Sequence, residues 1–365
     1  MDGTVRRSHR MKILVTGICG FTGSTLAMSL LERIHDLSIC GIDNLMRPGS
    51  EVNRAALKRL GIDVIHGDTR NLSDFEKVPR VDWVVDAAAN PSVLAGVNGS
   101  GTSRQLFEHN VAGAVNVLEY CKVKRAGFIL LSTSRVYSIS ALAGLPLRVE
   151  DGAFRLDCSK VLPRGISAAG INADFPTEPP ISLYGSTKLS AEALALEYGF
   201  AFEFPVWIDR CGVMAGAGQF GTPDQGIFSY WINAHLRRRP MRYIGFKGTG
   251  HQVRDAMHPR DLASLLHAQI STSRKEGTRK YTVGGGPANA MSLKQLTAWC
   301  DSKFGIHQPE PDPLPRNYDV PWIVMDSTCV ANDFGWRCDN NLSAILDEIA
   351  CHAEQHPEWL EVTGL

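Results

Sequence analysis

A glycine-rich turn near the amino-terminal end constrains the fold of this chain more than any other feature of its sequence. Three glycines spaced three residues apart, in Gly17-Ile18-Cys19-Gly20-Phe21-Thr22-Gly23, follow the apolar run Lys12–Thr16 and open a stretch with helical periodicity. Glycine at such a turn lets a phosphate group approach the backbone, and the first amides of the helix point toward it. The turn predicts a strand, a candidate phosphate-binding loop and a helix, although a purely structural tight turn would carry the same glycines.

The alternation of apolar runs and helical stretches continues as far as residue 211, which is typical of a parallel sheet covered by helices. We predict strands at Lys12–Thr16, Leu37–Ile42, Val64–His66, Trp83–Ala87, Phe128–Ser132 and Val206–Arg210. Helices are predicted near Thr22–Arg33, Asn53–Leu60, Gln105–Lys124 and Leu183–Tyr198. We therefore expect an α/β fold with a doubly wound parallel sheet of the Rossmann type over residues 11–211.

After residue 211 the pattern changes to Gly- and Pro-rich connections around isolated helices. These helices are predicted at Gly226–Arg238, Ser292–Phe304 and Ser343–Glu354. We expect residues 212–365 to form mainly a smaller C-terminal α/β domain that binds the substrate. The boundary is approximate, because the chain can cross back to the sheet.

Composition argues against several classes of partner. The 365 residues contain 38 Lys plus Arg and 38 Asp plus Glu, so net charge does not point to nucleic acid. Neither the nine cysteines nor the histidines have metal-ligand spacing, so we assign no metal and expect free thiols. Residues 1–10 lack signal-peptide character, and no apolar run approaches the roughly 18 residues of a membrane span. We expect a cytoplasmic protein without a membrane partner.

Residues after the later strands fit a dinucleotide site. Asp43 ends a strand 20 residues beyond Gly23, where a carboxylate would bind an adenosine ribose and repel a 2′-phosphate, which favours NAD over NADP. Ala87, Ala88 and Ala89 would let a cofactor pass close to the fourth strand, or would serve only in packing. The candidate cofactor-binding residues are Gly17, Cys19, Gly20, Phe21, Thr22, Gly23, Asp43, Asn44, Asp68, Thr69, Ala87, Ala88, Ala89, Asn110, Tyr184 and Lys188.

Tyr184 and Lys188 are four residues apart in a helical stretch, so both emerge on one helical face. A tyrosine has a pKa of about 10, too high for a base at neutral pH, but a nearby ammonium and a nicotinamide cation favour the phenolate. The same spacing also occurs in solvated pairs, and the upstream glycine turn favours the catalytic interpretation. Thr133, at the end of the fifth strand, is our third catalytic candidate.

These motifs resemble those of the extended short-chain dehydrogenase/reductase family, the nucleotide-sugar epimerases and dehydratases. The resemblance runs from residue 12 to about residue 336 and implies that Thr133, Tyr184 and Lys188 form the catalytic triad. In this family the 4,6-dehydratases carry an Asp-Glu pair after the triad hydroxyl, whereas Ser134 and Arg135 follow it here. Epimerisation is therefore expected.

Several strings are similar to the CDP-paratose 2-epimerase group of this family: DNLMRPGS at 43–50, STSRVYS at 132–138, RCGVMAG at 210–216 and YIGFKGTGHQVRD at 243–255. The similarity implies that the tyrosine deprotonates the sugar 2-hydroxyl while bound NAD takes the C2 hydride. Return of the hydride to the other face of the keto sugar would invert C2 and regenerate NAD, so tight cofactor binding is expected. The alternatives are a UDP-hexose 4-epimerase, a one-way dehydrogenase or reductase, and a non-catalytic NAD-binding regulator.

The resemblance also implies a nucleotide-diphosphate sugar as substrate, clamped by arginines of the C-terminal domain. Gln225 and Asn289 fit structural turns equally well. The candidate substrate-binding residues are Asn90, Ser134, Arg135, Arg210, Gln225, Arg254, Asn289 and Arg316. A homodimer formed through Gln105–Lys124 and Leu183–Tyr198 is implied as well, although these helices would also simply cover the sheet.

Overall fold

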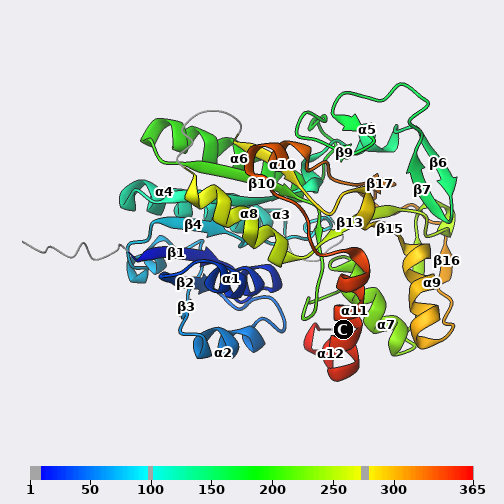
Figure 1. Ribbon diagram of the computed structural model, residues 1–365, viewed down its shortest axis with the longest axis horizontal. Coiled ribbons are helices and arrows are strands. Elements are labelled where there is room, and N and C mark those ends of the chain that lie inside the picture. The colour runs from blue at the N-terminus through cyan, green and yellow to red at the C-terminus, as the bar shows by residue number, and fades with distance from the viewer. Residues whose placement is uncertain (1–9, 98–101, 273–278, 365) are drawn as a thin grey trace, which may run out of the picture.

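A seven-stranded parallel sheet forms the centre of the larger part of the molecule (Figure 1). The computed structural model describes residues 10–97, 102–272 and 279–364. The strand order is β14-β10-β5-β4-β1-β2-β3, and every neighbouring pair is parallel. The strands are β1 (Met11–Thr16), β2 (Leu37–Asp43), β3 (Asp63–His66), β4 (Trp83–Asp86), β5 (Gly127–Thr133), β10 (Val206–Cys211) and β14 (Lys280–Val283). The predicted doubly wound sheet is confirmed.

Helices cover both faces of this sheet, and its strands alternate their side chains between two apolar clusters. On one face, α1 (Phe21–Arg33), α2 (Glu51–Arg59) and α8 (Pro259–Ser271) pack over the first cluster. On the other face, α4 (Gly113–Lys124) and α6 (Leu183–Phe202) pack over the second. Burial on both faces explains why the strands are apolar almost throughout.

The predicted helix Gln105–Lys124 is interrupted, which differs from our expectation. It consists of α3 (Ser103–Phe107), a π-helical turn η2 (Glu108–Ala112) and α4. Asn110 lies in the turn, where its side chain accepts a hydrogen bond from Asn90 N at 2.8 Å and donates one to Asn90 O at 3.0 Å. The π turn thus ties this helix to the segment that follows β4.

The C-terminal half is built around a smaller four-stranded sheet. Its strands are β11 (Val213–Met214), β13 (Val253–Met257), β15 (Ala290–Ser292) and β17 (Trp322–Ile323). Three helices, α7 (Ile227–Leu236), α9 (Leu293–Phe304) and α11 (Leu342–Gln355), share one apolar cluster. Further short elements of this half are β12 (Arg242–Ile244), η4 (Phe246–Gly248), η5 (Pro287–Asn289), β16 (Glu310–Asp312), α10 (Thr328–Phe334) and α12 (Trp359–Val362), whereas η1 (Leu72–Lys77) and η3 (Ser134–Val136) follow β3 and β5 of the large sheet.

The chain crosses between the two halves more than once, so residue 211 does not divide it cleanly. Within 212–365, α8 packs on α1, and β14 pairs with β10 as the seventh strand of the large sheet. In the opposite direction, the connection between β5 and α6 joins the smaller half, where its hairpin lies beside β15 and α9 (Figure 1). This connection contains α5 (Ile139–Ala143), β6 (Leu147–Glu150), β7 (Ala153–Leu156), β8 (Ile166–Ser167) and β9 (Gly170–Ile171).

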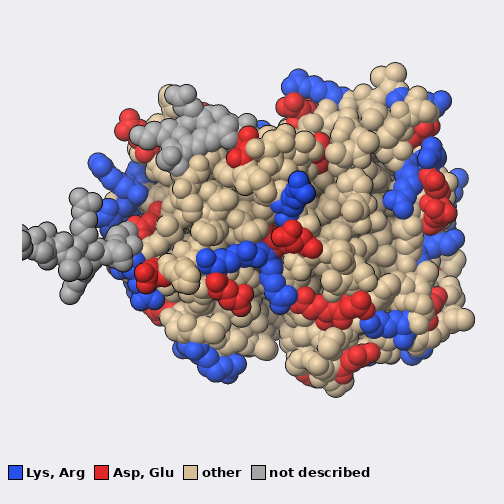
Figure 2. Space-filling model, in the orientation of Figure 1, with Lys and Arg blue, Asp and Glu red and all other residues tan. Residues whose placement is uncertain are grey.

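The surface mixes charges of both signs. On the face drawn in Figure 2, basic and acidic side chains lie interspersed, in keeping with a net charge of zero. Five of the cysteines are buried as free thiols: Cys19, Cys40, Cys121, Cys211 and Cys300. In the described parts of the chain, no helix combines the length and apolar character needed to cross a bilayer. Residues 1–9, from which we expected no targeting signal, lie outside the described residues.

Candidate active site

A cavity of about 560 Å³ opens at the carboxyl ends of the parallel strands, against the start of the C-terminal half. It is lined by the glycine turn, by residues that follow β2, β3, β4 and β5, and by the segment 212–226. An adjoining cavity of about 140 Å³ shares Arg135, Val213 and Gln225 with it. Ligands of doubly wound sheets bind at this edge, so the two cavities form the candidate active site.

The glycine turn is required sterically. Gly17 has a φ of +64°, and a Cβ there would lie 2.9 Å from Ala88 Cα. A Cβ on Gly23 would lie 2.3 Å from the carbonyl oxygen of Gly17. Gly20 caps α1 without a side-chain acceptor, so the first amides of the helix keep their capacity to bind an anion. This geometry fits the diphosphate of a dinucleotide.

Two carboxylates lie beyond the turn. Asp43 accepts hydrogen bonds from the backbone amides of Cys19 and Leu45, both at 2.8 Å, and burial raises its pKa. Asp68 is also partly buried, which opposes ionisation, but hydrogen bonds from Arg70 and Asn44 lower its pKa well below the usual range. Asp43 and Asn44 line the larger cavity, as do Gly67 and Thr69 on either side of Asp68, but Asp68 is not among its lining residues.

The predicted catalytic residues come together at the junction of β5 and α6. Ser182 caps α6 by accepting a hydrogen bond from Gly185 N at 3.1 Å, which places Tyr184 in the first helical turn and Lys188 in the second. Tyr184 is hydrogen-bonded to the side chain of Thr133, which stands at the end of β5. The four-residue interval between Tyr184 and Lys188, and the position of Thr133 at the end of the fifth strand, had predicted that these residues form one site.

Burial sets the proton affinity of both groups on α6. It raises the pKa of Tyr184 to about 12, an effect that the bond to Thr133 and the charge of Arg135 oppose. Burial also lowers the pKa of Lys188, which the carboxylates of Asp86 and Glu192 partly offset. The phenol therefore needs further positive charge nearby to lose its proton at neutral pH.

Three arginines line the smaller cavity: Arg135, Arg254 and Arg316. Arg254 forms an ion pair with Asp319 at 3.2 Å. The pKa of Arg254 is lowered to about 10, chiefly by burial and next by the charge of Arg135. Arg316 forms an ion pair with Asp224. Such a concentration of guanidinium groups suits a diphosphate, which accepts paired hydrogen bonds from arginine.

Comparison with known proteins identifies the family. Residues 13–284 match the family described as "NAD dependent epimerase/dehydratase family". The chain belongs to that family. Its predicted membership of the extended short-chain dehydrogenase/reductases and its predicted cofactor, NAD, are thereby confirmed, as is its assignment as an enzyme.

Individual epimerases resemble this chain over most of its length. CDP-paratose 2-epimerase of Salmonella typhi is 29% identical over 335 residues, which cover 89% of this chain and 94% of that protein. UDP-glucuronate 4-epimerase 1 of Arabidopsis thaliana is 25% identical over 362 residues, covering 94% of this chain and 76% of that protein. The crystal structure of UDP-glucose 4-epimerase from Bifidobacterium longum with NAD⁺ and UDP superposes with a TM-score of 0.77 at 19% identity, covering 96% and 100% of the two chains.

Most of the predicted cofactor residues of this family member border the larger cavity. Those lining it are Gly17, Gly20, Phe21, Thr22, Gly23, Asp43, Asn44, Thr69, Ala87, Ala88, Ala89 and Tyr184. Cys19 contributes its amide to Asp43, and Asn110 is occupied by bonds to Asn90 and Thr187. The side chain of Asn110 thus holds the wall of the site in place, and its binding of the cofactor stays a prediction.

Two predicted substrate residues lie away from both cavities and are bonded to other parts of the protein. Arg210 is only 1% exposed and forms an ion pair with Glu192 at 2.7 Å beneath α6. Asn289 donates to Asn340 O at 2.8 Å and accepts from Leu342 N at 2.9 Å, so it fixes the start of α11. Neither residue lines either cavity. Asn90, Ser134 and Gln225 do line the larger one.

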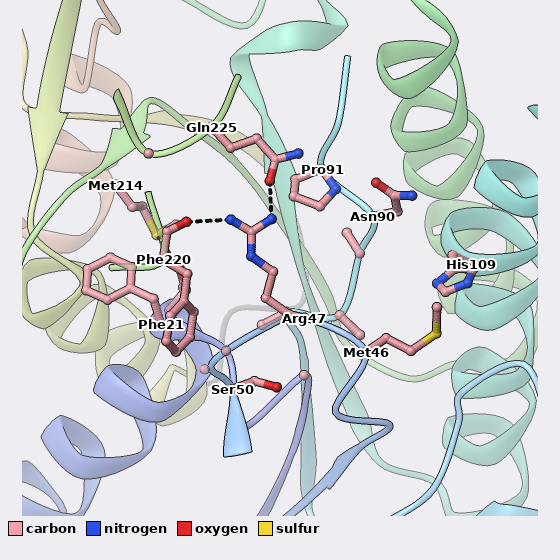
Figure 3. Close-up of a pocket in the computed structure, with 18 of the residues that line it drawn as sticks. Phe21, Met46, Arg47, Ser50, Asn90, Pro91, His109, Met214, Phe220 and Gln225 are labelled. Carbon is pink, nitrogen blue, oxygen red and sulfur yellow. Dashed lines mark hydrogen bonds between the residues drawn. The ribbon is translucent and has the colours of Figure 1, made fainter. Parts of the chain in front are cut away.

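Two residues of the site were not predicted from the sequence: Arg47 and Asp86. Arg47 reaches into the middle of the larger cavity from the loop after β2 (Figure 3). It lies within the string DNLMRPGS, but nothing local indicates where its side chain points. Asp86, at the end of β4, accepts a 2.5 Å hydrogen bond from the hydroxyl of Thr16 and supplies negative charge to Lys188. The sequence signal that could have identified Asp86 is its position as an acidic residue at the end of an apolar strand.

Among residues 10–97, 102–272 and 279–364, no group of three or more His, Cys, Asp or Glu side chains is placed to bind an ion.

Proposed function

We propose that this enzyme epimerises a nucleotide-diphosphate sugar and that its reaction is inversion at C2 of a CDP-linked hexose or deoxyhexose. The observation that carries the proposal is the hydrogen-bonded pair of Thr133 and Tyr184, which borders the NAD cavity beside the cavity lined by arginines. A sugar whose diphosphate is bound by Arg254 and Arg316 would present its ring to this pair.

Bound NAD supplies reversible removal of a hydride from the reacting sugar carbon. Tyr184 Oη takes the proton of the adjacent hydroxyl as that carbon becomes a carbonyl, and returns it when the carbon is reduced on its other face. Thr133 holds the phenol in position, and the charge of Arg135 favours its deprotonated form. Lys188, one turn further along α6, is the residue that we expect to add positive charge. The sugar regains both the hydride and the proton that it lost, so the net reaction is an isomerisation.

The residues after Thr133 argue against dehydration. Ser134 and Arg135 both line the larger cavity, and neither is a carboxylic acid that could protonate a departing hydroxide. Elimination of water from the keto sugar therefore lacks a proton donor at this position. The keto sugar is instead reduced by return of the hydride.

The choice of C2 and of cytidine rests on the relatives. The CDP-paratose 2-epimerase is 29% identical and covers nearly the full length of both chains, and several strings around the site resemble its group. A second candidate is 4-epimerisation of a UDP-hexose or UDP-hexuronate, favoured by relatives such as the Arabidopsis enzyme and UDP-glucose 4-epimerase of Erwinia amylovora, which is 26% identical over 374 residues.

Proton NMR separates these candidates. The purified holoenzyme is incubated separately with CDP-paratose, CDP-glucose, UDP-glucose and UDP-glucuronate, and inversion is followed at C2 and C4. We expect inversion at C2 of a CDP-sugar, and its loss in Tyr184→Phe. Inversion at C4 of a UDP-sugar would replace the first candidate by the second, and stoichiometric oxidation of the sugar would refute both.

We also propose that the enzyme is a cytoplasmic homodimer that pairs through α4 and α6. Apolar side chains on these helices support this, since Val123 is 70% and Phe202 46% exposed in the single chain. Light scattering after gel filtration should give about twice the 39.9 kDa of one chain, and a mass of one chain would refute the dimer.

A further inference from the structure

The loop after β2 leaves the large sheet and packs against the C-terminal half. Gly49, in this loop, has a φ of +88°, and a Cβ there would lie 2.9 Å from the ring of Phe220. Phe220 stacks on Trp359, with ring centroids 5.5 Å apart, and Phe21 of the glycine turn joins the same apolar cluster. The loop 44–50 is thus docked where the two halves meet around the dinucleotide site.

Arg47 adds a polar connection across this junction. Its Nη1 donates to Gln225 Oε1 at 2.8 Å and its Nη2 donates to the carbonyl oxygen of Phe220 (Figure 3). Gln225 ends a turn that is itself closed by the bonds from Thr222 N to Gln225 O at 2.7 Å and from Gln225 N to Thr222 O at 3.1 Å, and Phe220 lies two residues before this turn. The guanidinium is therefore anchored on a turn whose own backbone is hydrogen-bonded.

The position of Arg47 relates this connection to the cofactor. Arg47 lines the same cavity as Phe21, Thr22 and Gly23, whose amides begin α1. Among the residues that the structure describes, no carboxylate forms an ion pair with it. Half-buried, with its pKa lowered by burial, the guanidinium gains from negative charge at the phosphate site.

We propose that Arg47 is a positioning residue that retains NAD by holding the loop 44–50 closed against the turn 220–225. An epimerase must return to its substrate the hydride that it removed, so release of the cofactor between the two steps would leave a keto sugar. A connection that slows cofactor release preserves the reaction. The inference depends on NAD binding, which family membership establishes, and is independent of which sugar is bound.

Exchange of labelled NAD into the holoenzyme, measured by rapid filtration, tests the proposal without any substrate. Arg47→Ala should exchange NAD at least about tenfold faster than the unaltered protein, equivalent to about 1.4 kcal/mol. Gln225→Ala, which leaves the bond to the Phe220 carbonyl, should exchange about threefold faster. Because both changes break the same connection, the double variant should exchange no faster than Arg47→Ala alone.

Two further variants serve as controls. Arg59→Ala removes an exposed arginine at the end of α2 and should leave exchange unchanged. Arg47→Lys should exchange quickly, and adding Gln225→Glu should restore slow exchange by supplying a new ion pair across the junction.

Three results would overturn the proposal. The first is slow exchange in Arg47→Ala. The second is effects of Arg47→Ala and Gln225→Ala that multiply in the double variant, since Arg47 would then act on the cofactor independently of the turn. The third is failure of Gln225→Glu to slow exchange in the Arg47→Lys background.

Discussion

Replacing Glu192 with glutamine should destabilise this protein far more than the same change on its surface. The Glu192 carboxylate accepts hydrogen bonds from Arg210 Nε at 3.0 and 3.1 Å and from Nη2 at 2.7 Å. The two side chains are only 4% and 1% exposed. Glutamine would leave the guanidinium buried without a countercharge and turn one amide hydrogen toward another donor. Loss of one partner from a buried pair costs about 3–5 kcal/mol.

Glu108→Gln is a matched control. Glu108 forms an ion pair with Arg104 at the same distance, 2.7 Å, but the Arg104 side chain is 87% exposed and that of Glu108 38%. Water screens such a pair, so its loss should cost about 1 kcal/mol or less. Thermal unfolding followed by circular dichroism, at one fixed NAD concentration, should show a midpoint several degrees lower for Glu192→Gln and little change for Glu108→Gln. Equal shifts in the two variants would refute the argument that burial decides the cost.

Three other predictions concern charge and pH. Because Arg135 lowers the pKa of Tyr184, Arg135→Gln should move the rising limb of the kcat/KM profile to higher pH. An unchanged profile would show that the charge of Arg135 does not affect ionisation of the phenol. Arg316→Gln should weaken binding of the nucleoside diphosphate, measured by calorimetry, by about 1.5–3 kcal/mol, or roughly ten- to a hundredfold. The bound NAD content should stay unchanged, and undiminished binding would show that Arg316 does not bind the diphosphate. Burial raises the pKa of Asp209 to about 7, above its unfolded value, so the folded state holds this proton more tightly and stability should fall as pH rises from about 4 to 7. Asp209→Asn should abolish that part of the pH dependence in urea unfolding, and an identical slope in the variant would contradict the assignment.

Much of the site was accessible from sequence because its signals are local. The spacing of Gly17, Gly20 and Gly23 reflects contacts within one turn, where a Cβ would clash with nearby backbone. The four-residue interval between Tyr184 and Lys188 follows from the helical repeat. Apolar runs located six strands of the large sheet, since each strand is buried on both faces.

Tertiary structure decided what those patterns left open. The seventh strand, β14, comes from beyond the expected boundary, because the edge of β10 that it covers is defined only after the sheet has assembled. Arg210 and Arg47 look alike in sequence, yet one is neutralised by Glu192 beneath a helix and the other bonds a distant turn across the cavity. An arginine side chain is long enough to reach either kind of partner. Which partner it meets depends on segments distant in the chain. The sequence by itself therefore determined six strands of the sheet, the cofactor turn and the catalytic spacing, whereas the folded structure decided the partners of Arg47 and Arg210.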